Sequence, residues 1–370
     1  MILINTLKNT LRPIISRYLA NATLVEGVLK GTGKPFRCLF IENSNMMEYL
    51  CTRSYEAYPH ILKKWKTWIP FLQKTIGKYA SFIDLCIVVL PISYDSDLEG
   101  AYNFKTPEWV SQVLDISGSW ENIRKSFHKA PKKTERKIIK YGLTYNISND
   151  INDFKHFYYQ MYLPLIEKQQ ADHAYIDTYE EMLPFFLKGF LLMVMENDHA
   201  IAGGLCFQEK NSIIFRRLGV LGADENYIKK GAQSAIYYFI ISFAKETGFQ
   251  LVDFMWSKPF LNDGIYKHKR DWGADVYSSS ESECWIFFII TRHSENVVSF
   301  FENNPVIITS KDALSGLVGL RDGKKANRDQ EVFLTKQFYA GGIKNLMVLT
   351  PDSVEEINYT FAGIMENNDE

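Results

Sequence analysis

The sequence lacks long hydrophobic runs. Its longest apolar stretch, residues 235–244, contains two tyrosines and is about half of the roughly 18 to 20 residues that a transmembrane helix needs. The N-terminal segment, residues 1–20, is basic and amphipathic but has no continuous hydrophobic region and no obvious cleavage site. We therefore expect no transmembrane segment and no secretory signal, and we expect the N-terminal segment to dock onto its own domain.

Cysteines are few and scattered. The chain has 5 of them, Cys38, Cys51, Cys86, Cys206 and Cys284. They form no C-x-x-C pair and no cluster with histidine at the spacing of metal ligands. We therefore expect reduced, buried thiols in a cytoplasmic protein, and no metal site.

An excess of charge of one sign is also missing, and so are the short signatures of several enzyme classes. Lysine and arginine total 42 and aspartate and glutamate total 43, which gives a formal net charge of -1 at pH 7. This balance indicates no DNA partner. The sequence contains no G-x-S-x-G, P-loop or H-E-x-x-H string, so nothing local supports a hydrolase, a P-loop NTPase or a zinc protease.

The chain does contain enough apolar residues for a large core, since 46% of its 370 residues are hydrophobic. Its middle part has the clearest periodicity, with short polar breaks of hairpin length between three apolar runs. The predicted elements, in order, are a strand over 143–149, a helix over 151–168 kinked at Pro164, a helix begun by Asp177 with Glu180, an antiparallel meander of strands over 191–196, 201–208 and 213–220, a helix over 228–247 ended by Gly248, and strands over 251–256 and 284–290.

The two flanks are less regular. Residues 46–60 and 61–75 have helical spacing, and residues 82–90 have the pattern of a strand. We expect three parts: an N-terminal α/β domain over 1–119, a central domain over 120–292, and a small C-terminal α/β appendage over 293–370.

A strongly basic segment precedes the strand predicted over 143–149. Between residues 124 and 140, eight lysines and arginines accompany a single acid, Glu135. Gly142 can end a helix formed by this segment. In such a helix, Ile138 and Ile139 would be turned inward. The cations then form either a solvated face or a dock for the phosphates of a substrate, and the residues of this candidate dock are Lys132, Lys133, Arg136 and Lys137.

A second candidate site lies where the helix predicted over 228–247 begins. A helix N-terminus presents unpaired N–H groups and the positive end of the helix dipole, and both suit a pyrophosphate. Lysine and glycine before a helix are also common where no ligand binds. The residues that could hold a donor here are Lys230, Gly231, Ala232, Gln233 and Ser234.

The most specific stretch is residues 252–274, VDFMWSKPFLNDGIYKHKRDWGA. It resembles the pattern of CelD-like and Fem-like acyltransferases of the GNAT superfamily: a strand that ends in D-F, a loop with glycine, and then an aromatic/K-x-x-W/F-G motif. The matching residues are Asp253, Phe254, Gly264, Lys269, Trp272 and Gly273. His268 stands where the family commonly has tyrosine, and Tyr266 lies two residues earlier.

Two further features agree with this resemblance. The basic segment is similar to the family's run of cations that ends in a K-x-G turn, and the predicted element order is that of the GNAT fold. The resemblance therefore implies an α/β fold with a mixed, mostly antiparallel sheet flanked by helices, present in tandem if the N-terminal domain is a degenerate copy. The family's Q/R-x-x-G-x-G/A pyrophosphate signature is matched only in part, because Ile228 and Gln233 replace two of its residues.

The resemblance also implies a reaction, the transfer of an acyl group to an amine without a covalent enzyme intermediate. This chemistry needs a polarised carbonyl, a stabilised oxyanion and a deprotonated amine. Lys269 would supply fixed positive charge, Tyr266 or His268 would protonate the leaving group, and Asp253 would orient them or accept the proton of the amine. The alternatives are that Asp253 caps the following loop and that Trp272 belongs to the core.

The implied donor is an acyl-CoA, used as a co-substrate, and the implied acceptor is a small-molecule amine such as an amino sugar or a nucleotide-linked precursor. Two other functions stay open. One is a Fem-like transferase that takes its aminoacyl group from tRNA, with the basic segment as the tRNA dock. The other is a noncatalytic binding module that keeps the GNAT fold and has lost the donor site.

Overall fold

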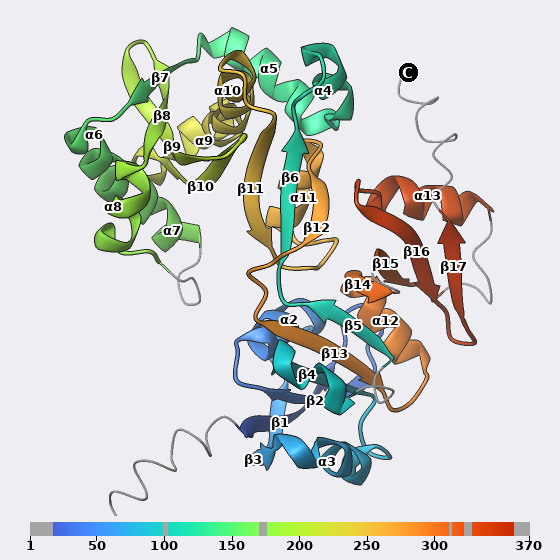
Figure 1. The fold of residues 1–370 in the computed structure, drawn as a ribbon. Helices are drawn as coiled ribbons and strands as arrows, with labels where there is room; N and C mark the ends of the chain where they lie inside the picture. The colour runs from blue at the N-terminus through green and yellow to red at the C-terminus, as the bar shows by residue number, and fades with distance from the viewer. Residues whose placement is uncertain (1–17, 99–102, 170–175, 311–312, 322–327, 359–370) are drawn as a thin grey trace, which may run out of the picture. The chain divides into compact units, whose positions relative to one another are not determined.

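The computed structural model describes residues 18–98, 103–169, 176–310, 313–321 and 328–358 (Figure 1). The chain forms two compact units. The first unit comprises residues 1–110, 258–263 and 278–370, and the second comprises residues 111–257 and 264–277. Most of the N-terminal segment that we expect to dock, residues 1–17, lies outside the described residues. Within the described ranges, no helix is long and apolar enough to cross a membrane.

The first unit is built around a six-stranded sheet of order β3-β1-β2-β4-β13-β5. Strand β2 runs parallel to β4, and the pairs β1–β2, β1–β3, β4–β13 and β13–β5 are antiparallel. Helices α2 and α12 pack on one face and α3 on the other. The elements are β1 (Leu19–Val28), β2 (Pro35–Glu42), α2 (Met46–Ser54), β3 (His60–Trp68), α3 (Leu72–Tyr79), β4 (Leu85–Pro91), β5 (Phe104–Pro107), β13 (Cys284–Ile290) and α12 (Glu295–Asn303).

A four-stranded sheet completes the first unit, with order β14-β15-β16-β17. Strands β15 and β16 are parallel, and helix α13 lies between them in the chain. The elements are β14 (Val306–Ser310), β15 (Ala313–Gly319), α13 (Arg328–Phe338), β16 (Ile343–Leu349) and β17 (Val354–Asn358).

One predicted helix is wrong, and one predicted strand is confirmed but belongs to this unit. The helix predicted over 61–75 is mostly strand β3, because pairing with β1 outweighs the local helical spacing. The strand predicted over 284–290 exists as β13, but it pairs with β4 and β5 instead of joining the central sheet. Its side chains are buried on both faces, which explains its unbroken apolar run.

The second unit has a seven-stranded sheet of order β12-β6-β11-β10-β9-β8-β7. The predicted meander is confirmed, since β8, β9 and β10 pair antiparallel, and β10 runs parallel to β11. The expected fold class, a mixed and mostly antiparallel sheet flanked by helices, is therefore present. The sheet and its first helices are β6 (Val110–Asp115), α4 (Trp120–Ser126), α5 (Lys129–Tyr141), β7 (Thr144–Ser148), β8 (Gly189–Glu196), β9 (His199–Glu209), β10 (Ser212–Val220), β11 (Leu251–Ser257) and β12 (Asp275–Ser278).

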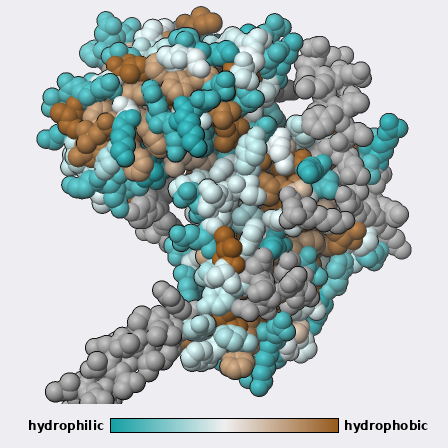
Figure 2. Space-filling model, viewed as in Figure 1, coloured by the Kyte–Doolittle hydropathy of each residue, from teal (hydrophilic) through white to brown (hydrophobic). Residues whose placement is uncertain are grey.

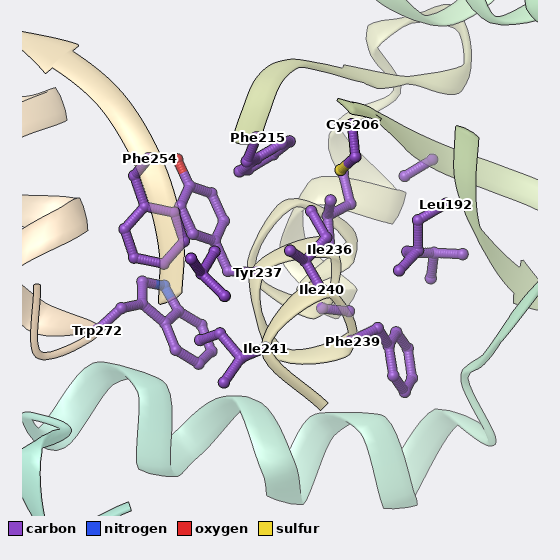
Figure 3. Packing of buried hydrophobic residues seen from close by; sticks show 14 of the residues in the cluster. Leu192, Cys206, Phe215, Ile236, Tyr237, Phe239, Ile240, Ile241, Phe254 and Trp272 are labelled. Atoms are coloured by element: carbon purple, nitrogen blue, oxygen red, sulfur yellow. The ribbon is translucent and has the colours of Figure 1, made fainter. Parts of the chain in front are cut away.

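Helices cover both faces of this sheet. Helix α10 packs on one face, and Figure 3 shows its Ile236, Tyr237 and Ile240 among side chains of the strands. The other face carries an apolar cluster from the helices before β8. A π-helical segment, Phe157–Tyr162, lies just before Pro164, which cannot donate a backbone hydrogen bond. The remaining helices are α6 (Ile151–His156), α7 (Leu163–Gln169), α8 (Tyr179–Leu187), α9 (Glu225–Lys230), α10 (Ala232–Glu246) and α11 (Gly264–Asp271).

Two predicted helix starts are shifted. Helix α8 begins with a capping box of Thr178 and Glu181 instead of Asp177 and Glu180, because arginines of β10 hold the Asp177 carboxylate. The helix predicted over 228–247 is divided at Gly231, whose φ of 96° ends α9 and precedes α10.

The 5 cysteines are free thiols, as predicted, and all are buried except Cys284, which is half-buried. Burial raises the pKa of the Cys284 thiol to about 11, so this group is protonated at neutral pH.

On the face seen in Figure 2, brown apolar residues lie in small groups among teal hydrophilic ones.

Candidate functional site

The candidate site in the second unit is centred on the place where β10 and β11 stop pairing. Their parallel pairing covers only three residue pairs and ends at Ile214 and Asp253. The register of β10 with β9 shifts between Phe215 and Arg217, which marks a β-bulge at Arg216. Because α10 runs back from the end of β10 toward the start of β11, the N-terminus of α10 lies at the end of the sheet where these strands separate.

Asp253 is the last residue of β11 that pairs with β10. Its neighbours Val252 and Phe254 belong to the core under α10, so strand alternation directs Asp253 to the opposite face. Its Oδ1 accepts a hydrogen bond of 2.6 Å from the backbone N–H of Met255, a non-glycine residue with a φ of 60°. Burial raises the pKa of the Asp253 carboxyl, and the Met255 N–H and the Lys269 charge oppose this shift.

Lys269 lies on α11 and is buried, with 6% of its surface exposed. Its Nζ donates a hydrogen bond of 2.7 Å to the backbone oxygen of Trp256, near the end of β11. Its charge acts on the Asp253 carboxyl, so the structure brings these two candidate residues into one electrostatic environment. Lys267, two residues earlier, is exposed.

Tyr266 and His268 are directed into the interior. Tyr266 is fully buried, and its backbone oxygen accepts a hydrogen bond of 3.1 Å from Gln112. The His268 ring meets the Tyr237 ring edge to face, with 4.6 Å between centroids, and its Nε2 lies 3.4 Å from the donor Nε1 of Trp272. Burial lowers the pKa of His268, which favours the neutral imidazole.

Trp272 is a core residue, which was the structural alternative for this position. It is 1% exposed and stacks near Tyr237, with 5.9 Å between ring centroids (Figure 3). Phe127, after α4, meets it edge to face at 5.2 Å. The W-G part of the motif therefore fixes α11 on the sheet.

The N-terminus of α10 has no side-chain cap. Gly231 and Ala232 are buried, and Gln233 and Ser234 are half-buried. Lys230 forms an ion pair with Glu196 of β8, with 2.7 Å between Nζ and Oε1. Of the residues predicted to hold a donor, Lys230 is therefore already engaged by a carboxylate.

The basic helix α5 meets this site through Lys137, and its last residue, Tyr141, lies under the Lys230 ammonium group, 5.8 Å from Nζ to the ring centroid. The Nζ of Lys137 donates a hydrogen bond of 2.8 Å to the backbone oxygen of Lys229, and the side chain of Lys137 covers Gly231. The other three dock residues, Lys132, Lys133 and Arg136, are exposed on the same helix. The prediction that Ile139 turns inward is wrong, because it is 81% exposed; successive helix positions are about 100° apart, and only Ile138 packs on the core.

Sequence reasoning missed a buried ionic cluster next to the β10 bulge. Asp177, 2% exposed, forms ion pairs with Arg217 and Arg216. The Arg216 guanidinium lies over the Phe185 ring, 3.7 Å from its centroid. Two adjacent arginines inside an otherwise apolar strand were the signal in the sequence that could have revealed this cluster.

A cavity of about 520 Å³ lies in the first unit, and no predicted site residue lines it. It is bounded by residues at the ends of β2 and β4 and by Cys284, and the described residues that line it carry no charge. It is separate from the chemistry predicted for the second unit.

If the first turn of α10 holds CoA, as the sequence predicts, replacing Gly231 by alanine is expected to weaken CoA binding about tenfold or more, the effect of losing one hydrogen bond to a charged group. A Cβ at this position would lie 2.9 Å from Cδ of Lys137, and the positive φ adds strain. Gly142→Ala is the matched control, because Gly142 also has a positive φ, of 60°, and a Cβ there meets nothing within 4 Å. Calorimetric titration with CoA would compare them, and equal CoA affinities would remove Gly231 from the donor site.

Asp253→Asn is expected to change how stability depends on pH. The raised pKa of Asp253 means that the folded protein holds this proton more tightly than the unfolded chain, so stability falls as the pH rises from about 3.9 through the raised value. The variant should lack this fall.

Asp115→Asn gives the opposite control, and urea unfolding at a series of pH values measures the stability of both variants. Hydrogen bonds from the Ser117 side chain and backbone N–H lower the pKa of Asp115, so its contribution is present above about 3.9 and is lost below the lowered value. If the free energy of unfolding depended on pH in the same way in the two variants, the environments assigned to Asp253 and Asp115 would be wrong.

The comparisons with known proteins give structural similarity only. No protein-family model matches the sequence, and no curated protein does. Similar solved structures include FemX (TM-score 0.38, 12% identity, 72% of this chain and 84% of that chain) and L-PGS from Bacillus licheniformis (TM-score 0.35, 8% identity, 71% and 83%). Another is a GCN5-related N-acetyltransferase from Sphaerobacter thermophilus (TM-score 0.32, 10% identity, 68% and 71%). At these values the site has to be argued from the chain's own geometry.

Proposed function

We propose that the second unit is an N-acyltransferase that moves an acyl group from an acyl-CoA-like donor to an amine. The observation that carries this proposal is the early end of the β10–β11 pairing at Asp253, together with the uncapped N-terminus of α10 at the same end of the sheet. Strands that separate offer backbone N–H groups to a carbonyl, and a helix N-terminus suits a phosphate.

The donor would lie along the separated strands, with its phosphates toward Gly231 and the first turn of α10. Lys137 supplies a cation over this turn, and the exposed cations of α5 extend the positive charge away from it. Lys230 contributes less charge, because Glu196 neutralises it. The groups that would bind the phosphates of the donor are therefore the backbone N–H groups of the first turn of α10 and the Lys137 side chain.

The reaction would proceed by direct attack. The amine nitrogen forms a bond to the donor carbonyl carbon, the carbon–sulfur bond breaks, and the thiolate leaves and takes up a proton. Asp253 is suited to accept the proton of the ammonium group, because burial raises its pKa toward that of a useful base. Lys269 supplies a buried positive charge that acts on Asp253, and in the proposal it stabilises negative charge on the intermediate. The His268 ring packs against Tyr237 of α10 and Tyr266 is fully buried, so both act as supports in the proposal.

The test is an assay of the full-length chain with acetyl-CoA and a set of primary amines that includes amino sugars. The released thiol is measured with a chromogenic disulfide, and CoA binding is measured separately by calorimetry. Amine-dependent thiol release supports the proposal. CoA binding without release for any amine would indicate the noncatalytic module, and the absence of both would overturn the acyl-CoA donor.

The second candidate is an aminoacyl-tRNA-dependent transferase, which the exposed cations Lys132, Lys133 and Arg136 on α5 favour. Binding of this kind weakens steeply with salt, because the protein displaces counterions from the phosphates. Filter binding of charged tRNA at two salt concentrations distinguishes the two donors. Salt-sensitive tRNA binding without CoA binding would favour the tRNA donor.

A further inference from the structure

The first unit carries a basic and apolar strip along the free edge of its six-stranded sheet. Strand β3 is the outer strand, and within the described ranges it pairs with β1 alone. It leads through a short 3₁₀ turn into α3, and Figure 1 shows the two elements at the same end of the unit. The strip comprises residues 60–79.

The charge of the strip has one sign. It contains five lysines, Lys63, Lys64, Lys66, Lys74 and Lys78, and no aspartate or glutamate. All five are exposed. In the described part of the chain, no carboxylate forms an ion pair with any of them. A chain of nearly zero net charge therefore concentrates positive charge on one sheet edge.

Large apolar side chains are exposed within the same strip. Phe71 is 63% exposed, Leu62 46%, Trp68 44% and Ile61 42%. At about 3.3 Å per residue, β3 spreads Ile61, Leu62 and Trp68 over roughly 23 Å, and Phe71 follows in the 3₁₀ turn. Strand alternation puts Lys64, Lys66 and Trp68 on one face, and Lys63 lies over the Tyr79 ring on the other.

We propose that this strip docks the protein onto the surface of an anionic lipid bilayer. Exposed tryptophan, phenylalanine and aliphatic side chains enter the headgroup region, while neighbouring lysines contact anionic headgroups. A second copy of the chain fits less well, because five lysines would face five lysines across the edge. RNA also fits less well, because Ile61 and Leu62 cannot stack on bases and Trp65 is packed against Tyr79 at 5.1 Å.

Co-sedimentation of the full-length chain with lipid vesicles tests this proposal. The protein should bind vesicles that contain phosphatidylglycerol far more strongly than vesicles of phosphatidylcholine alone. The double variant Lys64→Gln/Lys66→Gln should bind the anionic vesicles about 30-fold more weakly, because each lysine near such a surface contributes roughly fivefold. Trp68→Ser/Phe71→Ser should also weaken binding, through the loss of apolar contact.

Lys155→Gln/Lys188→Gln, which removes two exposed lysines from the second unit, is the control for charge and should bind like the wild type. Thermal unfolding checks that all variants are folded, which their exposed positions favour. Equal binding to neutral and anionic vesicles would overturn the proposal. So would a loss of vesicle binding in this control as large as the loss in Lys64→Gln/Lys66→Gln. Loss of tRNA binding by Lys64→Gln/Lys66→Gln, with vesicle binding unchanged, would assign the strip to RNA. Loss of a dimer in sedimentation analysis, with vesicle binding unchanged, would assign it to a second copy.

Discussion

Lys269→Met is expected to lower the rate of acyl transfer about 100- to 1000-fold, the usual effect of removing one preorganised group that stabilises transition-state charge. The physical reason is the environment of Lys269. The side chain is 6% exposed, and its charge acts on the Asp253 carboxyl at the point where β10 and β11 separate. Fixed charge in such a poorly solvated place acts more strongly than charge in water.

The same variant has a structural cost that has to be measured separately. The Nζ of Lys269 donates to the backbone oxygen of Trp256, and methionine leaves this acceptor without that donor. The expected loss of unfolding free energy is about 1 to 3 kcal/mol. Lys269→Arg keeps a positive charge, so it should recover more activity than Lys269→Met if charge is what matters.

Lys267→Met is the matched control, since Lys267 is exposed on the same helix. Steady-state rates for the variants, with the folded fraction of each determined by urea unfolding, give the comparison. A decrease in kcat at nearly constant KM indicates a role in the transition state. Near-native rates for both methionine variants would remove Lys269 from the mechanism.

The sequence predicted the central fold well because the second unit follows local rules. The meander over β8, β9 and β10 has apolar runs separated by breaks of hairpin length, and Gly142 and Gly248 have positive φ values where helices end. Each of these signals lies within a few residues of the feature it specifies.

Long-range pairing is what the sequence could not supply. Strand β13 has the pattern of a buried strand, but nothing within residues 284–290 says that its partners are β4 and β5, almost 200 residues earlier by the numbering of the chain. The edge strand β3 has helical spacing within its own residues, and it is a strand because it pairs with β1, a partner that lies about 40 residues earlier.

The candidate site was predictable in its residues more than in their roles. The motif identified Asp253 and Lys269, and the Lys269 charge lowers the pKa of the buried Asp253 carboxyl against the effect of burial. It also identified Tyr266, His268 and Trp272, which burial assigns to the interior of the unit. A motif combines residues for chemistry with residues for packing, and only three-dimensional burial separates them. The Asp177 cluster carries no motif and emerged only from the contacts of β10.

Trp272→Ala is expected to lower the free energy of unfolding of the second unit by about 3 to 5 kcal/mol, the usual range for truncating a buried tryptophan. Trp272 is 1% exposed and is held between Phe127 and Tyr237. Its loss leaves a cavity between α11 and α10, two rigid elements that cannot close fully around it. Urea unfolding followed by circular dichroism measures the change.

Trp256→Ala is the matched control, because Trp256 lies on the adjacent strand β11 and is 40% exposed. Trp256→Ala should lower the free energy of unfolding by about 1 kcal/mol or less. Trp272→Phe distinguishes packing from chemistry: if Trp272 acts only through the core, phenylalanine should recover most of the stability and, in the folded fraction, near-native transfer rates. A stable Trp272→Phe variant without activity would instead place the indole in the reaction, even though it lies on the α10 side of the sheet and Asp253 points to the other.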